Sequence, residues 1–221
     1  MRNRFDRQLQ LLDEQLIHMG ELCEIAIADA TKALQEGNVE QAKAVMAADE
    51  EIDQMEKDIE RLCLKLLLQQ QPVARDLRRI SAALKMITDM ERIGDQTSDI
   101  AEIVLSTEKV AKSDIDEIGK MAGAVSKMVR DSVTAYVSKN MELAQNVIRA
   151  DDAVDLYFED VKEKMIAYIK EEKGNHGKQI FDLIMVTKYL ERIGDHATNI
   201  AEWVEFSITG VHRNNVELEL R

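Results

Sequence analysis

The chain has 221 residues, 45% hydrophobic and 32% charged, with one proline and 4% aromatic residues, a composition that favours long helices over β-sheet. Its formal net charge of −13 repels phosphate backbones and anionic lipid, so we expect no nucleic-acid binding, and membrane contact only through partners. Cys23 and Cys63 form no CxxC motif or disulfide framework, which favours a reducing, cytoplasmic location.

Three helices are predicted in the first half of the chain. Apolar residues that alternate in spacing between four and three positions predict a helix that ends at Gly37. A second helix, which stops before Pro72, carries an apolar residue every seven positions, at Val45, Ile52, Ile59 and Leu66. A third helix is expected over residues 73–107.

The same order of elements is predicted in the second half. A fourth helix follows the segment EKVAKSD and again alternates apolar spacings of three and four. The fifth helix repeats an apolar residue every seven positions, offset by 102 from the second, at Val147, Val154, Val161 and Tyr168. After a loop at 171–177, a sixth helix is expected over 178–208.

Two copies of one phrase mark an internal duplication. ERIGDQTSDIAE at 91–102 and ERIGDHATNIAE at 191–202 are identical at eight of twelve positions. We therefore predict an all-α fold of six long helices, arranged as two tandem three-helix bundles. The first bundle is expected at 1–108, the second at 109–210, and a C-terminal tail at 211–221.

Carboxylates are repeated together with this phrase. Residues four apart lie on one face of a helix, and this spacing aligns the acidic residues Asp49, Asp53, Glu91, Asp95, Asp99, Asp151, Asp155, Glu191 and Asp195. Carboxylate pairs on adjacent antiparallel helices supply several oxygens, a donor set that suits hard cations or iron. The spacing alone leaves both metal binding and a solvated acidic face open.

Gly94 and Gly194 are expected in the middle of helices, where each glycine costs about 1 kcal/mol of stability relative to alanine. Either close helix packing or room for a ligand beside the backbone explains them. Arg92 and Arg192 are expected to pair with neighbouring acids.

The enzyme motifs we sought do not occur. No P-loop, nucleophile elbow or HExxH motif is present, and no histidine has a glutamate three residues before it, as a ferritin-like di-iron site requires. His196 follows Asp195, but Gln96 stands at the matching place, so a solvent-facing or structural role is expected. We predict a protein without enzymatic activity; a metal-dependent enzyme built on the carboxylates is the competing hypothesis.

Three segments resemble the hallmark sequences of the PhoU family of bacterial phosphate-uptake regulators: QQPVARDLRRI, MERIGDQTSDIAE and YLERIGDHATNIAEWV. The resemblance extends over essentially the whole chain. It implies a negative regulator of the phosphate-starvation response and of phosphate uptake, coupling the ATPase of the high-affinity phosphate ABC transporter to a sensor histidine kinase, and a homodimer. The alternatives are an accessory protein of another phosphate transporter and a metal-binding helical scaffold without a role in phosphate signalling.

The resemblance also implies multinuclear metal clusters on paired carboxylates. Asp49 and Asp53 would act with Glu91 and Asp95, and Asp99 would add a ligand. In the second half, the corresponding set is Asp151, Asp155, Glu191 and Asp195. Asn199 stands at the position that corresponds to Asp99 and is not a carboxylate. This difference predicts that the second site binds metal more weakly or holds a different number of ions. The pattern does not discriminate between Fe, Zn, Mg, Mn and Ca.

The segment QQPVARDLRR has no counterpart in the second half of the chain. Its proline would stiffen a turn between helices. Alternatively, Arg75, Arg78 and Arg79, which are unusual on so acidic a protein, would form a docking element for the transporter ATPase.

Overall fold

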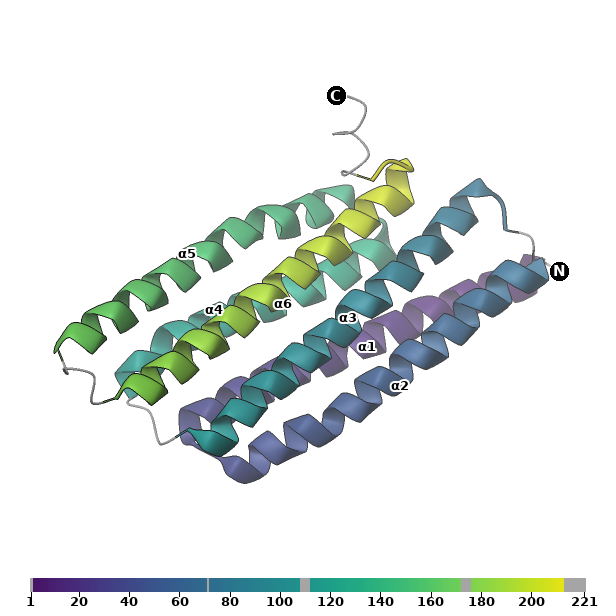
Figure 1. Cartoon of the computed structure of the whole chain (residues 1–221). Helices are drawn as coiled ribbons and strands as arrows, with labels where there is room; N and C mark the ends of the chain where they lie inside the picture. The colour runs from purple at the N-terminus through teal and green to yellow at the C-terminus, as the bar shows by residue number, and fades with distance from the viewer. Residues whose placement is uncertain (1, 71, 108–111, 172–175, 213–221) are drawn as a thin grey trace.

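The computed structural model describes residues 2–70, 72–107, 112–171 and 176–212. Within these residues it contains six helices and no strand, which confirms the predicted all-α fold (Figure 1). The helices are α1 (Arg2–Glu36), α2 (Val39–Gln70), α3 (Ala74–Ser106), α4 (Lys112–Ser138), α5 (Met141–Glu171) and α6 (Gly177–Thr209). Most of the predicted tail, at 213–221, lies outside the described residues.

The first turn of each bundle is built in the same way. Gly37 has a positive φ of 63°, and Lys139 holds the equivalent position after α4 with a φ of 54°. The following asparagine then caps the next helix, because Asn38 Oδ1 accepts from Gln41 N and Asn140 Oδ1 accepts from Leu143 N, each at 3.1 Å. These turns place successive helices antiparallel.

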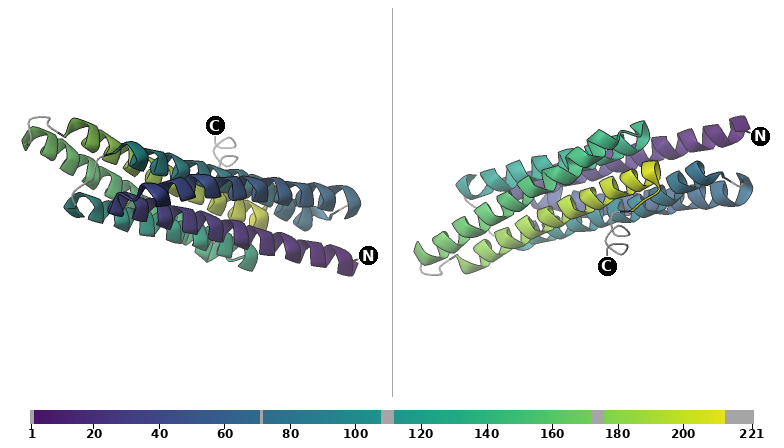
Figure 2. Two further views of the ribbon diagram at one scale, coloured as in Figure 1. Left: turned by 90° about the horizontal axis from the view of Figure 1, so that it is seen from below. Right: turned by 90° about the horizontal axis from the view of Figure 1, so that it is seen from above.

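Four central helices join the two bundles. In the first bundle, α1, α2 and α3 contact one another, and in the second α4, α5 and α6 do so. The bundles meet where α3 packs on α6 and α1 packs on α4, while α2 and α5 lie on the outside (Figures 1 and 2). The two bundles are offset along their long axes, so the α2–α3 hairpin protrudes at one end and the α5–α6 hairpin at the other (Figure 2).

One hydrophobic cluster runs through both bundles. The predicted seven-residue repeats lie in it, since Val45, Ile52, Ile59, Leu66, Val147, Val154 and Val161 are all buried. Burying each such side chain contributes about 1.5–3 kcal/mol before conformational entropy is subtracted. The repeats thus fix which face of α2 and of α5 points inward, and therefore where their carboxylates stand.

Candidate metal centre

The carboxylate of Asp49 on α2 lies directly against the backbone of Gly94 on α3. A methyl group on Gly94 would stand 2.6 Å from Asp49 Oδ1 and 3.2 Å from Ile52 Cδ1, closer than van der Waals contact. Gly94 therefore allows α2 and α3 to pack closely, and room for a ligand beside the backbone stays a prediction. Asp49 Oδ1 is shielded from solvent and has no hydrogen-bond partner.

Gly194 on α6 faces Asp151 on α5 in the equivalent position. Here a methyl group would stand 3.3 Å from both Asp151 Oδ1 and Val154 Cγ1. The second bundle thus repeats the arrangement with a looser fit. We call the first carboxylate face Asp49, Asp53, Glu91, Asp95 and Asp99, and the second carboxylate face Asp151, Asp155, Glu191 and Asp195.

These carboxylates repel one another. Burial, followed by the charge of Asp95, raises the pKa of Asp49 from 3.8 to about 6. Burial, followed by the charge of Asp195, raises the pKa of Asp151 from 3.8 to about 6. Both shifts record a site in which negative charge lacks a full counter-charge.

Arginine supplies part of the counter-charge on the first carboxylate face. Arg92 Nη1 donates to Asp95 Oδ2 at 2.8 Å, and Arg92 Nε lies 3.5 Å from Glu91 Oε2. Burial and the charge of Asp95 raise the pKa of Asp99, which the cation of Arg192 partly offsets. The expectation that Arg92 pairs with neighbouring acids is therefore confirmed.

The structure brings the predicted carboxylates of each bundle onto facing helices but does not gather them into a closed shell. Among the residues that the structure describes, no three His, Cys, Asp or Glu side chains are arranged so as to hold a metal ion. The donor chemistry nevertheless suits a hard cation, because Asp49 Oδ1 is buried without a partner and the charges that act on Asp49 are those of carboxylates, Asp95, Asp53 and Asp99. Metal binding stays a prediction.

The sequence interpretation missed flanking residues that differ between the two faces. In the first bundle, Glu56 on α2 accepts a hydrogen bond from Thr88 on α3 at 3.5 Å. The matching positions in the second bundle are Phe158 and Lys188. Aligning the two halves at the offsets of the heptads and of the ERIGD phrases would have found them.

His196 joins the two bundles. Its Nδ1 lies 2.9 Å from Asp89 Oδ1 on α3, and Asn199 Nδ2 donates to the same oxygen at 3.1 Å. The structural role expected for His196 therefore takes the form of a polar contact across the α3–α6 interface. Asn199, where the first bundle has a carboxylate, serves the same contact.

The three predicted docking arginines do not share one environment. Arg75 is exposed, and Arg78 is half-buried, with its Cδ 3.3 Å from the point where a Cβ on Gly210 would stand. Arg79 is only 15% exposed, forms an ion pair with Asp13 and lies 5.8 Å from the ring centre of Tyr136. Including Arg79 in an exposed docking surface is therefore wrong, because an internal ion pair holds its side chain. Docking through Arg75 and Arg78 stays a prediction.

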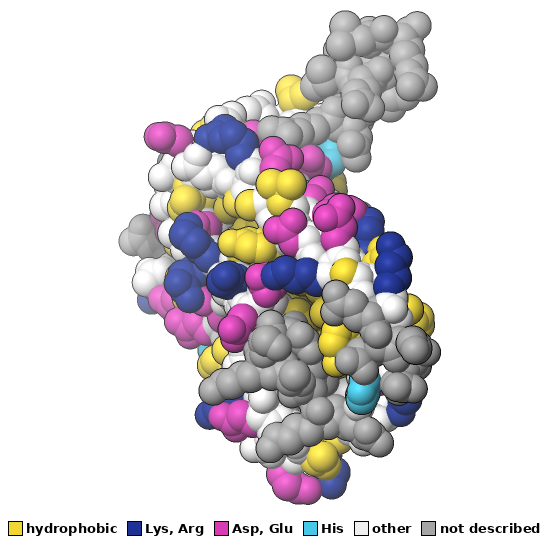
Figure 3. All heavy atoms as spheres, turned by 90° about the vertical axis from the view of Figure 1, so that its left-hand side faces the viewer, with side chains coloured by type: hydrophobic (Ala, Val, Ile, Leu, Met, Phe, Trp, Pro, Cys, Tyr) yellow, Lys and Arg dark blue, Asp and Glu magenta, His cyan; other side chains and the backbone are white. Residues whose placement is uncertain are grey.

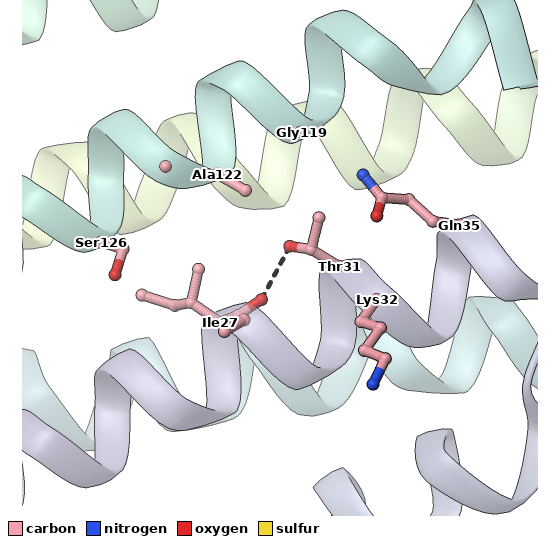
Figure 4. Close-up of a pocket in the computed structure, with 9 residues that line it drawn as sticks. Ile27, Thr31, Lys32, Gln35, Gly119, Ala122 and Ser126 are labelled. Carbon is pink, nitrogen blue, oxygen red and sulfur yellow. Dashed lines mark hydrogen bonds between the residues drawn. The ribbon is translucent and has the colours of Figure 1, made fainter.

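A groove of about 290 Å³ lies between α1 and α4 (Figure 4). Lys32 and Gln35 border it on α1, and Gly119 and Ser126 border it on α4. The hydroxyl of Thr31 donates to Ile27 O of its own helix, at 2.7 Å. None of the residues that line the groove is a carboxylate, histidine or cysteine, so its chemistry is unlike that of an acid–base site.

The fold and the carboxylate faces together define a class of duplicated helical proteins in which each three-helix bundle presents paired acids on two facing helices. Comparison with protein families gives the same division, since the model of the PhoU domain matches residues 16–104 and 118–204. The chain belongs to the PhoU family.

The relatives match over most of their length. The "Phosphate-specific transport system accessory protein PhoU homolog" of Clostridium acetobutylicum is 36% identical over 211 residues, which cover 95% of this chain and 96% of that protein. The protein of the same description from Aquifex aeolicus is 39% identical over 188 residues, 84% of each chain. The predicted resemblance is therefore confirmed.

Solved structures share the architecture. PhoU from Pseudomonas aeruginosa superposes with a TM-score of 0.84 at 31% identity, covering 94% of this chain and 100% of that chain. The phosphate transport system regulatory protein PhoU from Streptococcus pneumoniae gives a TM-score of 0.86 at 25% identity, covering 94% and 98%. Among the described residues, no helix has the length and apolar character needed to cross a bilayer.

Proposed function

We propose that this protein restrains the phosphate-starvation response and phosphate uptake by linking the ATPase subunit of the high-affinity phosphate ABC transporter to a sensor histidine kinase. The observation that carries the proposal is the near full-length match to accessory proteins of the phosphate-specific transport system. Such an adaptor works by binding partners according to their state and requires no catalytic residues. We assign it no enzymatic activity and place it in the cytoplasm, where it would maintain phosphate homeostasis.

The surface of the protein suits contacts with other proteins. Large apolar side chains are exposed on both outer helices and beside them, including Leu68 at 83%, Leu156 at 66% and Phe181 at 61%. On the end of the molecule shown in Figure 3, basic side chains lie among acidic and apolar ones despite the net charge of −13. These features support docking of partners and formation of a homodimer.

The central experiment is recovery of partners from phosphate-replete cells. Tagged protein should retain the transporter ATPase, the sensor kinase or both, and deleting its gene should raise transcription of phosphate-starvation genes in replete medium. Recovery of a different phosphate transporter would favour an accessory role there. Recovery of neither partner, with unchanged transcription, would contradict the proposal.

Docking through the α2–α3 hairpin has its own test. Arg75→Ala with Arg78→Ala should weaken binding to the purified ATPase at least severalfold, because both arginines stand at the start of α3 on an otherwise acidic chain. Arg149→Ala, which removes an exposed arginine from α5, is the matched control. Equal affinities of the two folded variants would exclude docking at this hairpin.

We also propose that the carboxylate faces bind divalent metal, as single ions or multinuclear clusters of Fe, Zn, Mg, Mn or Ca. The metal would supply the counter-charge that the buried oxygen of Asp49 lacks and would link α2 to α3. Elemental analysis of protein purified without chelators should find metal, and the Glu91→Ala, Asp95→Ala variant should lose it from the first carboxylate face. Metal-free wild-type protein would contradict this assignment.

A further inference from the structure

The end of the α2–α3 hairpin exposes large apolar side chains. Leu64 and Leu68, near the end of α2, are 46% and 83% exposed, and they lie on one face because they are four residues apart. Val73, directly before α3, is 69% exposed, and Leu77 on the first turn of α3 is 45% exposed. The hairpin protrudes past the second bundle along the long axis (Figure 2), which leaves these side chains open to a partner.

Cations stand among these apolar side chains. Residues 64–80 contain four basic residues and one acidic residue, a net charge of +3 on a chain whose total is −13. Arg79 is held by the internal ion pair described above. Among the residues that the structure describes, no carboxylate forms an ion pair with the other three, Lys65, Arg75 and Arg78. These three cations are therefore available to acidic groups of another molecule.

The hairpin of the second bundle lacks this combination. At the offset of the heptads, Ala167 corresponds to Lys65 and Lys170 corresponds to Leu68. Each hairpin closes a bundle of the same design, so the requirements of the core do not explain the difference. An exposed leucine and an exposed lysine on only one of two equivalent hairpins indicate a role outside the core.

We infer that the end of the α2–α3 hairpin binds an acidic, amphipathic helix of the transporter ATPase. We call the residues that would make this contact the hairpin surface: Leu64, Lys65, Leu68, Val73, Arg75, Leu77 and Arg78. The apolar side chains pack against the apolar stripe of the bound helix, and carboxylates beside that stripe pair with the three cations. The inference rests on the proposed link to the ATPase and adds the chemistry of the segment that is recognised.

The composition of the hairpin surface favours a protein over a membrane. Segments that lie in a bilayer interface favour aromatic side chains, and binding to anionic lipid takes clusters of about four to eight basic residues. The hairpin surface has three cations and no aromatic residue. Its apolar side chains instead form two pairs spaced four apart, Leu64 with Leu68 and Val73 with Leu77, a spacing that builds the ridges with which helices pack together.

Binding of the purified transporter ATPase to the full-length protein, measured by biolayer interferometry, tests the apolar contacts. Leu68→Ser with Val73→Ser should weaken binding about tenfold or more, because two exposed side chains lose their burial against the partner. Leu156→Ser with Phe181→Ser is the matched control, since it removes side chains that are 66% and 61% exposed from the second bundle. The control should bind like wild type, and circular dichroism establishes that each variant folds.

Charge reversal tests the three cations. Lys65→Glu with Arg75→Glu should weaken ATPase binding about tenfold or more, and its remaining binding should depend less on salt than that of wild type. Lys120→Glu with Arg149→Glu reverses two exposed cations of the second bundle and should bind like wild type. The two variants have the same net charge, so a difference between them reports the position of the cations.

Photo-cross-linking identifies the bound segment. Benzoylphenylalanine in place of Leu68 should form cross-links to a helix of the ATPase that carries Asp or Glu beside an apolar stripe. Replacing those carboxylates with lysine should restore binding of the Lys65→Glu, Arg75→Glu variant. Cross-links to a basic segment, or no restoration by the folded ATPase variant, would overturn the inference.

The remaining outcomes separate the inference from the function on which it rests. ATPase binding that the hairpin variants leave unchanged, or that the controls weaken equally, would overturn the hairpin surface and leave the link to the ATPase intact. Vesicles of phosphatidylethanolamine and phosphatidylglycerol that bind wild type but not the hairpin variants, with ATPase binding unchanged, would assign the surface to a membrane. A homodimer that the hairpin variants dissociate, again with ATPase binding unchanged, would assign it to a second copy. Wild-type protein that does not bind the ATPase would overturn both the inference and the proposed link.

Discussion

At the scale of single residues, two equivalent glycines differ in how tightly their surroundings fit. A methyl group on Gly94 would stand 2.6 Å from Asp49 Oδ1, whereas the nearest atoms to a methyl group on Gly194, Asp151 Oδ1 and Val154 Cγ1, would be 3.3 Å away. Alanine gains about 1 kcal/mol over glycine from helix propensity, so the effect of substitution depends on whether the neighbours can yield. Comparing alanine substitutions at these two positions therefore separates the effect of steric fit from the effect of helix propensity within one molecule.

We predict that Gly94→Ala destabilises the protein and Gly194→Ala does not. The new methyl group in Gly94→Ala displaces the Asp49 carboxylate and presses on Ile52, which should lower the unfolding free energy by about 1–2 kcal/mol after the propensity gain. Gly194→Ala should stay within about 0.5 kcal/mol of wild type. Urea unfolding measures both, and equal effects would contradict the steric explanation.

The raised pKa values of Asp49 and Asp151, about 6 in place of 3.8, predict a pH dependence. Between these values the folded protein binds more protons than the unfolded chain, so the unfolding free energy falls as the pH rises through this window. Because both side chains are partly exposed, solvent screening limits each contribution to about 1 kcal/mol or less. In chelator-treated protein, these two groups should therefore contribute more to the unfolding free energy near pH 4.5 than near pH 7.

Asp49→Asn isolates one of these contributions. The stability advantage of the variant over wild type should be smaller at about pH 4.5, where folded Asp49 is largely protonated, than at about pH 7.5, where wild-type Asp49 is charged. Asp6→Asn, on the exposed side of α1, serves as control. If Asp49→Asn had the same effect at both pH values, the assigned shift would be wrong.

At the scale of elements, a polar cluster joins three helices of the two bundles. Arg79 on α3 pairs with Asp13 on α1, and the hydroxyl of Tyr136 on α4 donates to Arg79 O at 2.8 Å. Tyr136 is 1% exposed, so this hydrogen bond lies in the core. The cluster therefore links the first bundle to the second.

Arg79→Ala should cost about 1–3 kcal/mol of unfolding free energy, because it leaves Asp13 partly buried without its cation. Arg75→Ala, four residues earlier on the same helix and exposed, should change the unfolding free energy by less than about 0.5 kcal/mol. Thermal unfolding of the two variants makes the comparison. Similar losses of unfolding free energy in both variants would show that any arginine near the start of α3 contributes to stability, and that the ion pair with Asp13 is not the cause.

The sequence predicted the elements well and their mutual contacts poorly. The heptads at Val45 and Val147 fixed the inward faces of α2 and α5 because each of these helices packs against one side of the molecule. Helix α3 contacts α1, α2 and α6, so its buried residues form no single stripe. The Asp89–His196 contact and the internal role of Arg79 follow from that packing, which no local spacing encodes.

The candidate site shows the same limit. Spacing placed Asp49 and Asp151 beside the ERIGD helices, and the structure puts each against the glycine of that phrase. Glu56 and Lys188, which flank the two faces, stand outside the repeated carboxylate pattern. Only the three-dimensional pairing of α2 with α3 and of α5 with α6 makes these residues part of the site.

At the scale of the whole molecule, the two bundles are repeats that share one core. The hydrophobic cluster is continuous from Leu12 and Leu16 on α1 to Val125 and Val129 on α4, and α3 packs along α6. Neither bundle can cover these faces by itself. The duplication therefore produces two repeats with a shared hydrophobic core, although each repeat contains a complete set of three helices.

We predict that residues 1–108 and 109–210, expressed separately, do not fold independently to full stability. Each fragment exposes the apolar faces at which α1 meets α4 and α3 meets α6, and burial of such surface contributes about 25 cal/mol per Å². The fragments should bind a hydrophobic dye, self-associate in size-exclusion chromatography with light scattering, and melt well below the full chain. Mixing them should restore a 1:1 complex with a higher melting temperature. A monomeric fragment that melts within about 5 °C of the full chain would show instead that each bundle is a domain in its own right.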